Sequence, residues 1–173
     1  MDGDTLALHW YIAGKAEFRA WFPHPNQVKH ESFAEVARLY DYVQMNAMEA
    51  ALLDPHVADL EKLALRLRWL LEEKVEFAIT NGGDGEGLLW AQDNGRFGWH
   101  KIRPEQVRVL SDVGAGDTWG SAYLISRRFF AENAANACAW AGQTVARSIS
   151  GQPLVPTQVS AKFVNRSWAE TAL

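Results

Sequence analysis

The run Gly114-Ala115-Gly116-Asp117 places small residues and a carboxylate where a helical pattern begins. Small residues at the start of a helix expose backbone N–H groups beside the positive end of the helix dipole, an arrangement that binds anions. A neighbouring carboxylate could accept the proton of an attacking hydroxyl during phosphoryl transfer. The four residues alone are equally consistent with a structural role, in which Asp117 caps the helix and the glycines form the turn.

A second candidate loop follows a predicted strand at residues 75–80. It contains Thr80, Gly82 and Gly85, and because glycine has no side chain, phosphate or a nucleotide could lie directly against this backbone. Glycines at a strand end more often serve a turn, so the motif by itself favours the structural interpretation.

A third candidate, the pair Asn46 and Glu49, comes just after a predicted strand at residues 42–45. The amide and the carboxylate are three residues apart, so they could share one helical face and hold water on a magnesium ion. The same spacing is that of an ordinary helix cap, in which each side chain bonds to the backbone of the other residue. The pair alone therefore does not indicate a metal site.

The elements that must position these residues alternate between strand and helix patterns. Apolar runs bounded by turn residues predict strands at residues 5–12, 42–45, 75–80 and 107–110, and the Asn94-Gly95 turn predicts a hairpin of residues 88–91 and 97–102. Helices are predicted at residues 32–39, 57–73, 118–130 and 134–149, with a loop at residues 22–26. We therefore expect an α/β fold, a Rossmann-like, mostly parallel sheet with flanking helices and one β-hairpin, with ligands beyond the carboxyl ends of the strands.

Length and composition favour one domain over residues 1–173, because 48% of the 173 residues are hydrophobic. The net charge of -4 and the scattered lysines and arginines argue against a nucleic-acid partner. No run approaches the roughly 18 apolar residues of a membrane span, and the acidic start at residues 1–4 is unlike a secretory signal. We expect a cytoplasmic protein without a membrane partner, with the single Cys138 packed in the core.

The three candidate loops gain weight in combination, because each follows a predicted strand and they are equally spaced along the chain. Their order resembles that of the PfkB or ribokinase-like family of carbohydrate and nucleoside kinases. The run Ser111-Asp-Val-Gly-Ala-Gly-Asp-Thr-Trp-Gly120 resembles the C-terminal signature of that family. The resemblance extends from about Tyr40 to Pro156 and concerns the nucleotide-binding half of such a kinase.

The resemblance implies ATP and Mg2+ as cofactors and a sugar or nucleoside-like small molecule as the substrate. It implies Asp117 as the catalytic base and a wall for adenine on the helix around residues 137–144. The remaining roles that it implies are an anion hole from the backbone of Gly114, Ala115 and Gly116, contacts with the ATP phosphates from Thr80, Gly82 and Gly85, and a Mg2+ site, reached through water, at Asn46 and Glu49.

Two features depart from the family pattern. Ser111 stands where an acidic residue is usual, and family members are nearly twice as long, with an N-terminal half that carries the sugar-binding motif. A truncated sheet leaves an edge strand and an apolar face to be covered. We therefore expect a partner, either a second copy of the chain or a separately encoded N-terminal half, and the tryptophan-rich first 25 residues favour this hypothesis.

Two functions from different classes follow. The first is ATP-dependent phosphoryl transfer to a hydroxyl of a sugar or nucleoside-like molecule, with Asp117 as the base. The second is a non-catalytic nucleotide-binding or interaction module that keeps the phosphate loops but has no sugar site of its own. An unrelated α/β domain whose glycines are purely structural is the third alternative.

Overall fold

The computed structural model describes residues 17–83 and 85–152, and within them a five-stranded sheet has the order β1-β2-β3-β4-β5. The strands are β1 (Ala20–Trp21), β2 (Tyr42–Asn46), β3 (Glu76–Thr80), β4 (Gly87–Asp93) and β5 (Arg96–Ile102). The first three strands are parallel, and β4 and β5 extend the sheet in antiparallel pairs. The sheet is therefore mixed, with a parallel half followed by a hairpin.

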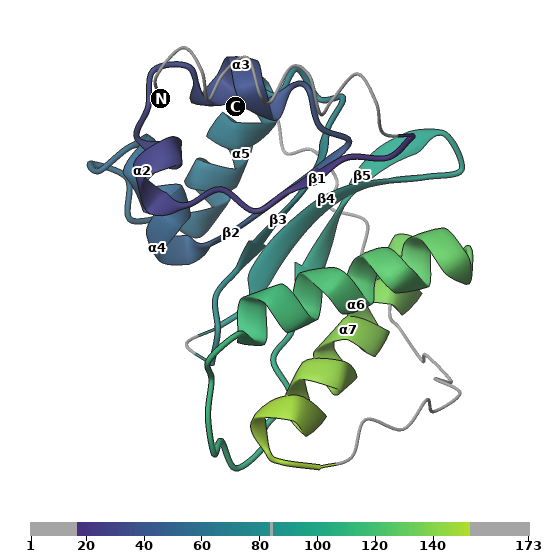
Figure 1. Cartoon of the computed structure of the whole chain (residues 1–173). Coiled ribbons are helices and arrows are strands. Elements are labelled where there is room, and N and C mark those ends of the chain that lie inside the picture. The colour runs from purple at the N-terminus through teal and green to yellow at the C-terminus, as the bar shows by residue number, and fades with distance from the viewer. Residues whose placement is uncertain (1–16, 84, 153–173) are drawn as a thin grey trace.

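Helices cover both faces of this sheet (Figure 1). One face carries α6 (Ala115–Phe129) and α7 (Ala134–Ile149). The other face carries α5 (Leu60–Leu70) and a group of short helices, namely α2 (Pro25–Val28), α3 (Phe33–Ala37), α4 (Ala47–Ala50) and the 3-10 turn η1 (Ala51–Leu53). The predicted α/β fold with flanking helices and one hairpin is confirmed. Among the described residues, no helix has the length and apolar character to cross a bilayer.

The two faces bury separate cores because successive residues of a strand point to opposite sides. In β3, Phe77 and Ile79 belong to the core beneath α5, whereas Ala78 belongs to the core beneath α6 and α7. Tyr42 of β2 and Cys138 of α7 lie in this second core, as predicted for the cysteine. The sheet residues beneath α6 and α7 include Ala78 and Ala91, whose small side chains let these helices lie close to the sheet.

The hairpin of β4 and β5 forms as the sequence predicts. Asn94 and Gly95 have φ values of 51° and 78°, the left-handed conformation that a two-residue turn of this kind requires. At the start of β4, a Cβ atom on Gly87 would lie 2.4 Å from the carbonyl oxygen of Ile79 in β3. Glycine at this position therefore permits the close approach of the hairpin to the parallel half of the sheet.

Five of the other predicted elements are found with shifted ends, α7 has the predicted bounds, and two predictions were wrong. The strand predicted at residues 107–110 is an irregular segment. No strand of the described part of the chain pairs with it, and Leu110 N instead donates to Ile149 O at 2.7 Å. The loop predicted at residues 22–26 contains the start of α2, where His24 and Gln27 form a capping box. The strand predicted at residues 5–12 lies outside the described residues.

Candidate functional site

The parallel strands β2 and β3 bring two of the predicted motifs together. Asn46, the last residue of β2, is the register partner of Thr80, the last residue of β3. Neighbouring strands lie about 4.8 Å apart, so these two partly buried residues adjoin at one edge of the sheet. In open α/β sheets this edge, at the carboxyl ends of parallel strands, is where ligands bind.

Asn46 and Glu49 form a complete capping box at the start of α4. Glu49 N donates to Asn46 Oδ1 at 2.8 Å, and Asn46 N donates to Glu49 Oε2 at 2.8 Å. The capping interpretation is therefore present in the structure, and it uses one oxygen of each side chain. Glu49 is only partly buried, and no described residue bonds to its second carboxylate oxygen. A role in binding water on Mg2+ stays a prediction that this geometry permits.

The loop after Thr80 connects β3 directly to β4. Gly82 is exposed and has a φ of 57°, in the left-handed region where glycine is favoured. A Cβ atom on Gly85 would lie 3.1 Å from Asn81 Nδ2, so this glycine makes room for the asparagine side chain. Both glycines thus have a turn function, and the bare backbone of Gly82 also faces open space where a phosphate could approach.

At the start of α6, fewer backbone N–H groups are available to an anion than the sequence predicts. Gly114 is the N-cap residue, with a φ of 75°, and Thr118 N donates to its carbonyl at 2.8 Å. Ala115 N donates to Asp112 O at 3.0 Å, so this amide is engaged within the turn. No carbonyl of the described chain accepts from Gly114 N, Gly116 N or Asp117 N. Two successive amides, those of Gly116 and Asp117, therefore remain for an anion in the first helical turn.

Asp117 does not serve as the N-cap of α6. It is the third residue of the helix, it is exposed, and no side chain caps this helix end. Among the described residues none hydrogen-bonds to its carboxylate. The capping role is thereby excluded for Asp117. Its carboxylate still interacts favourably with the positive end of the helix dipole, and it is exposed to a ligand that reaches the first turn.

Gln44 is a residue of this site that the sequence analysis missed. The residue is 4% exposed, and its Nε2 donates to Gly116 O at 2.7 Å while its Oε1 accepts from the hydroxyl of Tyr42 at 2.8 Å. Gly120, one turn further along α6, lies so close that a Cβ atom there would be 2.3 Å from Gln44 Oε1. The one signal in the sequence was a lone amide within the apolar run Tyr42-Val43-Gln44-Met45.

The helix expected to wall the adenine, α7, presents only part of its surface. Ala137 and Ala141 are completely buried in the core beneath α6 and α7. These two residues therefore cannot contact a nucleotide. Trp140 and Thr144 lie on the same helical face, three and seven residues after Ala137, and Trp140 packs against this core. Both are partly buried, and Thr144 Oγ1 donates to Trp140 O at 2.8 Å.

The residues of this site could hold Mg2+ only if phosphate groups of a ligand supplied further oxygen ligands to the ion. The described residues contain no group of three or more His, Cys, Asp or Glu side chains that could hold a metal. Mg2+ commonly retains several waters and is bound through one or two carboxylates together with substrate phosphates. The carboxylate of Glu49, which has one oxygen outside the capping box, is a donor of that kind.

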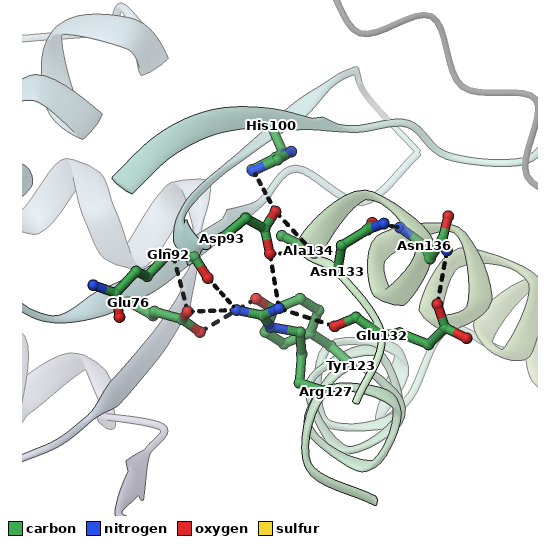
Figure 2. Close-up of polar contacts among 10 residues, drawn as sticks. All are labelled: Glu76, Gln92, Asp93, His100, Tyr123, Arg127, Glu132, Asn133, Ala134 and Asn136. Atoms are coloured by element: carbon green, nitrogen blue, oxygen red, sulfur yellow. Dashed lines mark hydrogen bonds and ion pairs between the residues drawn. The ribbon is translucent and has the colours of Figure 1, made fainter. Parts of the chain in front are cut away.

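The far end of α6 is anchored at the opposite edge of the sheet by a group that we call the Arg127 cluster (Figure 2). Its members come from β3, β4, β5 and α6, and they are Glu76, Asp93, His100, Tyr123 and Arg127. Arg127 pairs with Glu76 at 2.8 Å and with Asp93 at 2.9 Å. Burial raises the pKa of Tyr123, reinforced by the charge of Glu76, so the phenol remains protonated and donates to Glu76 Oε2 at 3.3 Å. The cluster is internally paired, which makes it a structural anchor.

No family model matches the sequence, and no curated protein does. Solved structures do match it. A ribokinase from Thermotoga maritima gives a TM-score of 0.62 at 19% identity, over 81% of this chain and 45% of that chain. Adenosine kinase from Schistosoma mansoni in complex with 2-fluoroadenosine gives 0.64 at 16% identity, over 84% and 45%. A pyrophosphate-dependent kinase in the ribokinase family, complexed with a pyrophosphate analog and myo-inositol, gives 0.63 at 16% identity, over 85% and 53%.

These structures share one architecture. The chain has the ribokinase-like fold. It spans about half the length of the solved structures that it matches. The resemblance noted in the sequence is thus confirmed as a likeness of fold, and the roles of the individual residues at the strand ends and at the start of α6 stay predictions.

Proposed function

We propose that this chain binds ATP with Mg2+ and transfers the terminal phosphoryl group to a hydroxyl of a sugar or nucleoside-like small molecule. One observation carries the proposal. The register of β2 and β3 places Asn46 beside Thr80, and the bond from Gln44 to Gly116 attaches the start of α6 to the same strand β2. Three motifs that are distant in the sequence therefore meet at the ligand-binding edge of a ribokinase-like fold.

In the proposed step, the hydroxyl oxygen of the substrate bonds to the terminal phosphorus of ATP as the bond to the bridging oxygen breaks and ADP leaves. Asp117 takes the proton of the hydroxyl, and its exposed carboxylate is suited to this because no described residue occupies it. The N–H groups of Gly116 and Asp117 stabilise the charge on the transferring group. Bound Mg2+ would neutralise charge on the phosphates.

The experiment is a Mg2+-dependent screen of phosphoryl transfer to a panel of sugars and nucleosides, with ATP and pyrophosphate offered in parallel as donors. Asp117→Asn should lower kcat by about 10²- to 10⁴-fold, the usual contribution of a positioned base. Glu105→Gln is the matched control, because it removes one carboxylate charge from an exposed residue outside the helices and strands and away from the proposed site, and it should keep the activity. Equal activity of Asp117→Asn and wild type would refute Asp117 as the base.

The second candidate is a nucleotide-binding module without turnover, and the length of the chain favours it. The chain spans about half of the kinases that it matches, so a substrate site would have to come from elsewhere. Calorimetry that shows ATP binding without phosphoryl transfer to any member of the panel would support this candidate. A second copy or a separate N-terminal half is the proposed partner, and sedimentation of a clean monomer would exclude the self-associated form.

A further inference from the structure

The strongest unexplained feature near the proposed site is the buried amide of Gln44. Gln44 and Ser126 are the buried polar or charged side chains of the described part of the chain. Burying an amide is costly unless its hydrogen bonds are satisfied, and Gln44 satisfies them in one arrangement only. The carbonyl of Gly116 can only accept, so the side-chain nitrogen must face it, and the side-chain oxygen then accepts from the Tyr42 hydroxyl.

That carbonyl belongs to the peptide unit that joins Gly116 to Asp117. The unit is planar and trans, so the Gly116 carbonyl and the Asp117 N–H point in opposite directions. A donor on the carbonyl side fixes the plane of the unit and polarises the N–H on the other side, because linked hydrogen bonds strengthen one another. The Asp117 N–H is one of the two successive amides that the first turn leaves for an anion.

The helix and the strand are also fitted to each other sterically. Gly120 has no side chain where a Cβ atom would lie 2.3 Å from Gln44 Oε1 and 2.4 Å from a ring carbon of Phe22. Phe22 is partly exposed and has room to move, whereas Gln44 is buried and has none. The glycine therefore lets α6 come close enough for the bond between Gln44 and Gly116 to form.

Gln44 also lies two residues before Asn46 on β2. Side chains two apart in a strand share one face, so the strand that ends at the proposed phosphate site carries the anchor of α6 on the same side. The separation between Asn46 and the start of α6 is thus determined by the single strand β2.

We infer that Gln44 is a positioning residue, which holds the Gly116–Asp117 peptide so that its N–H group and the Asp117 carboxylate face the proposed phosphate site. This inference rests on the proposed function. It assigns no contact between Gln44 and the substrate. It predicts that the amide acts through the carbonyl of Gly116.

The test compares wild type with Gln44→Met, which keeps the length of the side chain and removes the donor. The control is Arg127→Lys, which weakens the anchor about 16 Å away at the other end of α6, as estimated from the helical rise over the intervening residues. Three quantities are measured for each protein: the affinity for inorganic pyrophosphate and for Mg2+-ATP by calorimetry, the NMR order parameters of residues 114–118 without ligand, and the urea midpoint.

We expect Gln44→Met to bind pyrophosphate about tenfold more weakly, the equivalent of one lost hydrogen bond, with lower order parameters at Gly116 and Asp117. Arg127→Lys should lower the urea midpoint and leave both other readouts at wild-type values. Unchanged order parameters in Gln44→Met, or an equal loss of affinity in Arg127→Lys, would overturn the inference. If Gln44→Met does not fold, Gln44→Asn provides the same comparison, because it keeps the amide but shortens its reach.

Failure of the proposed function gives a different result. Wild-type protein that bound neither pyrophosphate nor Mg2+-ATP would refute the phosphate site. The order parameters of the unliganded proteins would still decide whether Gln44 fixes the Gly116–Asp117 peptide.

Discussion

Replacement of Arg127 by methionine should lower the free energy of unfolding more than the loss of any exposed ion pair would. The guanidinium pairs with Glu76 and Asp93 and also donates to Gln92 O at 2.6 Å and to Glu132 O at 2.9 Å. The side chains of Arg127, Glu76 and Asp93 are only 16%, 14% and 26% exposed, so Arg127→Met leaves two carboxylates largely out of water without a countercharge.

Removal of one partner of a buried ion pair costs roughly 3–5 kcal/mol, and the partial exposure of Asp93 places this case at the lower end, about 3 kcal/mol. For a domain of this size the loss corresponds to a fall in Tm of roughly 6–12 °C. The assay is urea unfolding followed by circular dichroism, with thermal melting as a second measure. Adding Glu76→Gln to Arg127→Met should recover part of the loss, because it removes one of the unpaired charges.

Lys74→Met is the matched control. Lys74 and Glu72 form an ion pair at 3.5 Å in which the side chains are 80% and 51% exposed. Such pairs contribute little, so this variant should stay within about 0.5 kcal/mol of wild type. A loss below about 1 kcal/mol in Arg127→Met would show that the Arg127 cluster does not anchor α6, since even a single net hydrogen bond is worth that much.

Two further predictions concern the sheet. Gly87→Ala should lower the free energy of unfolding by roughly 1–3 kcal/mol, the usual cost of overpacking, because the new Cβ meets the Ile79 carbonyl. Gly98→Ala is the control and should not lower it, because the space around that glycine is open; equal urea midpoints of the two variants would contradict the prediction. Burial lowers the pKa of His100, and the Arg127 charge lowers it further, against the opposing Asp93 and Glu76 carboxylates. The contribution of His100 to stability is therefore present above its unfolded pKa of about 6.5 and is lost as the pH falls through the folded value. His100→Asn should accordingly reduce the loss of stability that wild type shows between about pH 7.5 and 5. Replacement of the exposed His56 by asparagine is the control and should keep the wild-type pH dependence of the urea midpoint.

The elements that the sequence predicted well are those determined by local patterns. The helical spacing that continues to Ile149 and the Asn94-Gly95 turn depend on neighbours in the chain, and both α7 and the hairpin were placed closely. The segment at residues 107–110 has the alternation of a strand, but a strand also needs a partner edge. Here the carbonyl of Ile149, distant in the sequence, takes the amide of Leu110 instead.

The site was predicted in part for the same reason. The residue types at the strand ends marked Asn46 and Thr80 as candidates, and those at the start of a helix marked Asp117. The register of β2 and β3 places Asn46 and Thr80 side by side. The sequence could not show that Asp112 occupies the amide of Ala115, or that Gln44 reaches Gly116 across 72 positions of chain. Both depend on how α6 lies on the sheet, which is a property of the assembled fold.

The order of the strands has a consequence for how the chain folds. The hairpin of β4 and β5 closes across a two-residue turn, and the adjacent helices α6 and α7 also pair locally, so both units can form quickly. The parallel pairing of β2 with β3 must close a much longer loop that contains α5, which costs more entropy and takes more time. The edge that holds Asn46 and Thr80 is therefore expected to form late. The time at which the proposed phosphate binding appears during refolding would report this last stage of assembly.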